Sequence, residues 1–227
     1  MTVLKSIKLT FFSLFFLFSI NSFAQLSKTH YIPPICTLNT NASSPQLQYL
    51  YVSTPSQEEF DVTITPIGGI PETFQVSNSN PKDFLIGNGA ETNLIATSQS
   101  IGQIIDDRGF IINGEDLIYV SVKLLASSDN YQGAGLVSKG LPALGETFRV
   151  GTFQNESTDV DDVNQFGNPS INMLNFVSVL ATQNNTIVNF SDFGNGVTIV
   201  NDAEISNIEL NAGESYVIGI IPTVVYR

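Results

Sequence analysis

The chain has 227 residues, no tryptophan and a single cysteine, and its formal net charge at pH 7 is −12. Such an acidic protein repels the phosphates of nucleic acid, so we expect no nucleic-acid partner. With only Cys36, no intrachain disulfide can form, but a domain of about 200 residues buries enough surface to be stable without one.

The chain begins with the pattern of a secretory signal peptide. Lys5 and Lys8 supply a basic start, residues 9–20 form a short apolar run, and Ser22 and Ala24 stand at the small-residue positions before a cleavage site. The apolar run is shorter than the ~20 residues that a membrane span needs. We therefore expect cleavage after Ala24 and export through the Sec pathway, with no transmembrane segment in the mature chain. The protein would be secreted or held at the cell surface, and association with the outer membrane is an open alternative.

The only histidine and the only cysteine follow soon after this segment, at His30 and Cys36. A cysteine and a histidine can form a nucleophile with its general base. Pro33 and Pro34 lie between them and favour an extended path of about 3.1 Å per residue, which would separate the two by roughly 19 Å. We therefore expect no catalytic dyad here, and we expect Cys36 to be either a small buried residue or an unreactive thiol.

Apolar and polar residues alternate along most of the chain, and no window shows a sustained helical period. Phe60, Val62 and Ile64 share one face of residues 60–66. In residues 117–125 the apolar side chains Ile118, Val120, Val122 and Leu124 share one face, and Tyr119, Ser121 and Lys123 share the other. The same alternation predicts strands at residues 147–153, 175–182, 186–193, 196–200 and 214–226.

Turn signals separate these predicted strands. They are Gly68–Gly69, Asn113–Gly114, Asn195–Gly196 and Asn211–Gly213. Two longer polar stretches, residues 76–92 and 154–170, are rich in Asn, Gly and Pro, so we expect surface loops there. Loops are where binding residues usually lie, but the pattern assigns no particular ligand-binding residue. Short strands with frequent turns predict an all-β fold that is antiparallel by preference.

A weak internal repeat runs through the chain. Residues 49–69 resemble residues 176–196, and residues 112–120 resemble residues 210–218. A repeated β unit predicts tandem, sandwich-like antiparallel repeats, with propeller-like blades as the alternative, and the second repeat is expected to be incomplete. The predicted organisation is a signal peptide (1–24), a first β-rich unit with an N-terminal lead segment (25–153), and a loop with a second, truncated unit (154–227).

Carboxylates are the remaining side chains that could do chemistry. They cluster at Glu58–Glu59, Asp106–Asp107, Glu115–Asp116 and at Asp159, Asp161 and Asp162. Glycoside hydrolysis needs two carboxyl groups about 5 to 10 Å apart, whereas adjacent acids on a strand face opposite sides of the sheet. The last cluster lacks the spacing of a calcium loop. We therefore expect no catalytic residue, no metal site and no cofactor.

Five segments carry a family resemblance. They are residues 29–35, 49–55, 62–69, 117–124 and 135–151. Their combination resembles the IgGFc-binding protein N-terminal domain family, as found in exported, gliding-motility-associated surface proteins of Bacteroidota. The resemblance covers roughly residues 28–221, and its most specific parts are HYIPP at residues 30–34 and KGLPALGETFRVG at residues 139–151.

This resemblance implies an extracellular, β-rich binding or adhesion module that is not an enzyme. Family members in Bacteroidota often end in a sorting domain for type IX secretion, for which this sequence shows no match, and related animal domains occur in a mucus protein that binds immunoglobulin G. No catalytic or immunoglobulin-binding residue can be carried over. We expect an extracellular glycan or protein as the partner. Two alternatives stay open: a carbohydrate-active enzyme with a carboxylate pair on an all-β fold, and a structural spacer in a long surface protein.

Overall fold

The computed structural model describes residues 26–37, 45–125, 133–151, 175–194 and 197–222. The predicted signal peptide and the predicted loop at residues 154–170, with its three aspartates, lie outside these residues. Within them the fold is all-β, as the alternation predicts, and the only helical segments are three short 3-10 turns. These turns are η1 (Ser98–Ser100), η2 (Leu141–Ala143) and η3 (Val200–Asp202).

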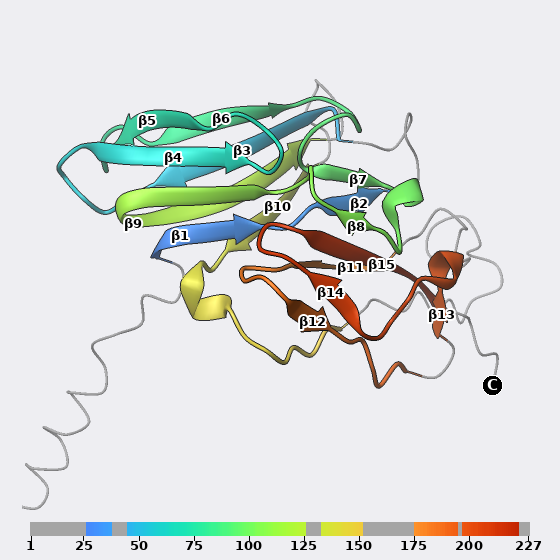
Figure 1. The fold of residues 1–227 in the computed structure, drawn as a ribbon. Coiled ribbons are helices and arrows are strands. Elements are labelled where there is room, and N and C mark those ends of the chain that lie inside the picture. The colour runs from blue at the N-terminus through green and yellow to red at the C-terminus, as the bar shows by residue number, and fades with distance from the viewer. Residues whose placement is uncertain (1–25, 38–44, 126–132, 152–174, 195–196, 223–227) are drawn as a thin grey trace, which may run out of the picture.

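The larger sheet has seven strands and is organised around its longest one. Its strands are β1 (Ser27–Ile32), β3 (Leu47–Ser53), β4 (Phe60–Pro66), β5 (Glu72–Val76), β6 (Lys82–Gly87), β9 (Phe110–Leu125) and β10 (Gly133–Ser138). The first half of β9 pairs with β1 and β4, and its second half pairs with β3 and β10, all antiparallel. The sheet curls, so that β3 to β6 lie over β9, β10 and β1 (Figure 1).

The inner face of this curled sheet holds the main core. Val62 and Ile64 of β4 and Ile118 and Val120 of β9 are fully buried there, which confirms the faces predicted for both strands. Strict alternation makes this possible, because every second side chain of a strand points to the same side. The opposite faces of the same strands carry polar and aromatic side chains toward solvent.

The smaller sheet lies beside the first and is built mainly from the C-terminal part of the chain (Figure 1). Its strands are β8 (Ile104–Ile105), β11 (Asn175–Leu180), β13 (Val197–Ile199) and β15 (Ser215–Pro222). A separate ribbon of β12 (Thr186–Val188) and β14 (Ile208–Leu210) packs near it, and Leu210 and Ile218 are buried in the core that they share.

A third core lies between the smaller sheet and a short parallel pair of strands. It is formed by Cys36, Ala96, Ile101, Ile105 and Val217. A short parallel pair supplies one side of it, β2 (Ile35–Thr37) with β7 (Ile95–Thr97), and β15 supplies the other. Two backbone contacts reinforce the junction: β8 pairs with β15, and the Gly102 N–H donates to the Val217 carbonyl at 2.9 Å. The predicted first unit therefore contributes a strand to the sheet of the predicted second unit.

The predicted repeat has a counterpart in the strand pairing. In the larger sheet, β4 pairs with the first half of β9 and β3 with the second half. In the C-terminal part, β12 pairs with β14 and β11 with β15, and the turn at Asn211–Gly213 separates these two partners. The same pairing order thus occurs twice, once with a continuous strand and once with an interrupted one.

Four local predictions are wrong. Asn113–Gly114 is not a turn but lies inside β9, because β4 pairs with both residues and keeps the backbone extended. The glycine is required there for another reason: a Cβ at Gly114 would lie 2.8 Å from the Asp116 carbonyl oxygen. The predicted loop at residues 76–92 contains β6, because Phe84 and Ile86 pack against the main core.

The other two errors concern predicted strands. The predicted strand at residues 147–153 has no strand structure over its described residues 147–151, which are exposed and pack against no neighbouring strand that would favour an alternating pattern. The strand predicted at residues 186–193 ends at Val188 because the backbone that follows leaves the strand pairing: the Phe190 N–H donates to the Ile205 carbonyl at 2.7 Å.

No helix within the described ranges is long and apolar enough to cross a membrane.

Candidate functional site

His30 lies in β1 and is fully buried, at 0% exposure. Its Nδ1 lies 2.9 Å from the Ser138 hydroxyl oxygen and its Nε2 lies 2.9 Å from the Ile118 carbonyl oxygen. A carbonyl oxygen can only accept, so Nε2 must carry the proton, and the Ser138 hydroxyl then donates to Nδ1. Both ring nitrogens of the neutral imidazole are therefore satisfied without any contact to Cys36.

Cys36 lies in β2, within the core between the β2–β7 pair and the smaller sheet. Burial raises the pKa of the Cys36 thiol to about 11, so the thiol is protonated at neutral pH. Its Sγ lies 4.0 Å from the Thr97 carbonyl oxygen, on the neighbouring strand β7. Because the thiolate and not the thiol is the nucleophile, this environment is that of a structural cysteine.

His30, which begins the first of the two most specific segments of the family resemblance, contacts the residue just before the second segment. Ser138 precedes the second segment by one residue and lies 108 positions from His30 in the sequence. Close by, the Leu141 N–H donates to the Ser27 hydroxyl oxygen at 3.2 Å, and Gly140 packs directly against Ser27. The segment after β10 is thereby fastened to β1, so this contact has a structural role.

We expect the stability of the protein to depend on pH through His30. Desolvation by burial lowers the pKa of His30 below its ordinary value of 6.5, so the unfolded chain takes up a proton first as the pH falls. The free energy of unfolding should therefore decrease below about pH 6.5, by at most about 1.4 kcal/mol per pH unit. Urea unfolding between pH 8 and pH 5 measures this slope.

The control for this prediction is the His30→Gln variant. His30 is the only histidine in the chain, so the variant removes every histidine titration from this pH range. Its unfolding free energy should be lower at pH 8 but should vary less between pH 7 and pH 5.5. An equal slope in the two proteins would contradict the assignment.

The described acidic pairs lie on the surface. Glu58–Glu59 lies in the β3–β4 turn, Asp106–Asp107 precedes β9, and Glu115–Asp116 lies within β9; all six are exposed. Some have local partners: Asp107 forms an ion pair with Arg108 at 2.9 Å, and Glu115 accepts from the Asp61 N–H at 3.3 Å. Among the residues that the structure places, no three His, Cys, Asp or Glu side chains gather as a metal site would require.

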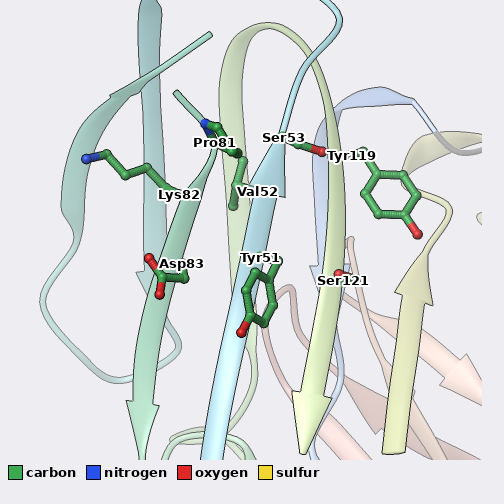
Figure 2. Close-up of a pocket in the computed structure, with 8 residues that line it drawn as sticks. All are labelled: Tyr51, Val52, Ser53, Pro81, Lys82, Asp83, Tyr119 and Ser121. Atoms are coloured by element: carbon green, nitrogen blue, oxygen red, sulfur yellow. The ribbon is translucent and has the colours of Figure 1, made fainter. Parts of the chain in front are cut away.

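A shallow pocket of about 330 Å³ lies on the outer face of the larger sheet. It is lined by Tyr51, Val52, Ser53, Pro81, Lys82, Asp83, Tyr119 and Ser121, from β3, β6, β9 and the residue before β6. The register explains it: Tyr51 stands opposite Ser121, and Ser53 stands opposite Tyr119. Large and small side chains thus alternate in both directions, and the serines leave a hollow beside the rings. Figure 2 shows Tyr51 between Asp83 and Ser121.

Further side chains surround Tyr51 on the side away from this hollow. The Tyr49 ring lies 5.9 Å from the Tyr51 ring between centroids, and the Lys123 Nζ lies 6.0 Å from the Tyr51 centroid. These contacts hold the ring in place while 36% of the residue stays exposed. The pocket therefore presents a supported aromatic ring to solvent.

Sequence reasoning assigned no ligand-binding residue and missed this pocket. The signal was present in part, because the alternation places Tyr119, Ser121 and Lys123 on one outward face. The missing information was the register, which brings Tyr51 of β3 and Asp83 of β6 beside them. The described residues thus define an all-β protein with a shallow, tyrosine-lined surface pocket. Comparison with protein-family models, curated proteins and solved structures found no match to this chain.

Proposed function

We propose that the chain is an exported, non-enzymatic binding or adhesion module of the IgGFc-binding N-terminal type. The observation that carries this proposal is the shallow pocket at Tyr51 and Tyr119. Concave surface sites with aromatic walls and a few polar groups are typical of ligand binding. A structural spacer would need no concave site, so the pocket favours a binding role over that alternative.

The contact at His30 supports the use of the family resemblance. Its two most specific segments, residues 30–34 and 139–151, are far apart in sequence, and each contacts a residue just outside the other: His30 contacts Ser138, and Gly140 packs against Ser27 and Thr29. Segments that pack on each other form one structural feature. Export through the Sec pathway, and the association with gliding-motility and type IX secretion systems, belong to the same proposal and rest on the signal-peptide pattern and the resemblance.

The enzymatic alternative has less support. A retaining or inverting glycosidase needs two carboxyl groups that face each other across a bound sugar. The described pairs at residues 58–59, 106–107 and 115–116 are all exposed, and none of them lines the described pocket. Asp83 is the only carboxylate among the residues that line the described pocket. A binding function therefore remains the proposal.

The test is a binding array that presents glycans and extracellular proteins to the purified chain, together with a polysaccharide turnover assay. We expect saturable binding to at least one ligand and no product release. If the chain binds neither a glycan nor a protein on the array, the proposal is overturned. Absence of binding together with turnover of a polysaccharide would favour the enzyme.

A further inference from the structure

We propose that the pocket beside Tyr51 binds a neutral sugar ring, stacked on the tyrosine; this inference rests on the proposed binding function and names its ligand class and its site. The site consists of Tyr51 and Tyr119 as walls, Ser53 and Ser121 as the floor, and Asp83 at the rim. A pyranose ring has an apolar C–H face and a border of hydroxyl groups. The pocket offers the matching surfaces to both.

The aromatic part of the site is preorganised. Tyr49 and Lys123 occupy the next row of the sheet, so they support Tyr51 on one side, and the row of Ser53 and Tyr119 lies on its other side. The second side of the ring therefore faces the hollow. An aromatic face is electron-rich and attracts the partly positive C–H groups of a sugar. A ring that is already held in place loses little entropy when the ligand stacks on it.

The polar part of the site suits hydroxyl groups. The hydroxyls of Ser53 and Ser121 can each donate and accept a hydrogen bond, and the Asp83 carboxylate can accept from two sugar hydroxyls at once. Asp83 stands directly opposite Tyr51 on β6, so this acceptor lies beside the ring. Figure 2 shows the carboxylate next to the Tyr51 side chain. Polar groups of this kind set the orientation of a stacked ring.

The charges favour a neutral ligand. Asp83 lines the pocket and Lys123 stands over Tyr51, and these two groups have opposite charges, whereas the Lys82 side chain points away from Tyr51 (Figure 2). A strongly anionic or cationic ligand would meet a like charge as well as an opposite one. The overall charge of −12 adds a general repulsion for polyanions.

The dimensions favour a glycan over a protein partner. Stable protein interfaces bury about 800 Å² on each partner and have cores that are poor in charged residues. Here eight residues line the pocket, and two of them are charged. The volume of about 330 Å³ lies at the small end of ligand pockets, which suits a short stretch of a glycan.

The experiment uses an array of neutral oligosaccharides built from glucose, mannose or galactose, with sialylated glycans and extracellular proteins on the same surface. Tyrosine fluorescence then gives an independent measure of stacking in solution, because the chain has no tryptophan to mask its seven tyrosines. We expect binding to a neutral oligosaccharide, competition by the matching free methyl glycoside, and a change in tyrosine emission on binding.

Four variants test the site. Tyr51→Ala removes the ring and should weaken binding by about tenfold or more, as expected for an aromatic anchor. Ser121→Phe fills the hollow and removes the Ser121 hydroxyl, so it should abolish binding although the Tyr51 ring is still present. Tyr51→Phe keeps the stacking surface and should stay within about threefold of the parent, since the ring and not its hydroxyl carries the contact. Tyr31→Ala, on β1 outside the pocket, is the matched tyrosine control, and thermal unfolding shows whether each variant is folded.

Each outcome decides between the inference and the function on which it rests. Binding to neutral glycans that Tyr51→Ala and Ser121→Phe leave unchanged would overturn the site. Binding only to sialylated glycans or only to proteins would overturn the neutral sugar and leave the binding function standing. If no ligand binds, both the neutral-sugar site and the binding function are overturned.

Discussion

The Phe110→Ala variant should lose about 3 to 5 kcal/mol of unfolding free energy, as large aromatic truncations in a core do. Phe110 is 1% exposed and begins β9, the strand on which the larger sheet is built. Its ring meets the Phe84 ring edge-on, with 6.5 Å between centroids and 75° between the planes. Truncation would leave a cavity between β9 and β6 and would remove this contact, so the loss should reach both strands.

Urea unfolding followed by far-ultraviolet circular dichroism measures the Phe110 effect. Phe148→Ala is the matched control, because Phe148 is 64% exposed and has no strand around it. Its stability should change by less than about 0.5 kcal/mol. Similar losses in the two variants would show that Phe110 does not belong to the core.

The second large effect is expected for Gly140→Ala, with a loss of at least about 2 kcal/mol. Gly140 has φ 62° and ψ −151°, a backbone region that is almost closed to residues with a side chain. A Cβ there would overlap the Ser27 side chain and would lie 2.9 Å from the Thr29 carbonyl oxygen. Strain and overlap therefore act together at the contact between β1 and the segment after β10.

Gly135→Ala is the control for this glycine. Gly135 lies in β10, and a Cβ there would meet only the Val122 carbonyl oxygen at 3.7 Å, an ordinary contact. Its unfolding free energy should stay within about 0.5 kcal/mol of the parent. Amide hydrogen exchange gives the local readout: Gly140→Ala should expose the β1 amides and Gly135→Ala should not. Equal protection of β1 in both variants would contradict the expected effect.

Period-two alternation was enough to predict the all-β fold and the inner faces of β4 and β9, because burial of one face leaves that pattern in the sequence. It was not enough at Asn113–Gly114, where a common turn pair occurs within a strand whose neighbours hold it straight. It also failed at β6, where flanking Asn and Gly residues hid a short alternation. The local sequence pattern does not reveal which distant strands a segment pairs with.

The candidate site shows the same limit. The sequence places Tyr119, Ser121 and Lys123 on one face, but only the register brings Tyr51 and Asp83 beside them. His30 is a second example. Its local sequence gives no sign of its partners, whereas pairing of β1 with β9 and the bond to Ser138 make it fully buried. Both features depend on strand pairing between residues far apart in sequence.

The strand β8 has a consequence for how such modules can be inherited. It lies between β7 and β9 in the chain, yet it pairs with β15 in the other sheet, and Ile105 packs beside Val217. The N-terminal unit supplies β8 to the sheet of the C-terminal unit. If either unit were duplicated, deleted or exchanged alone, the edge of β15 would lose its partner strand and apolar side chains would be exposed. If tandem copies of this architecture are exchanged between proteins, we expect both sheets to be transferred together. A recombination point between residues 105 and 215 would separate two parts of one fold.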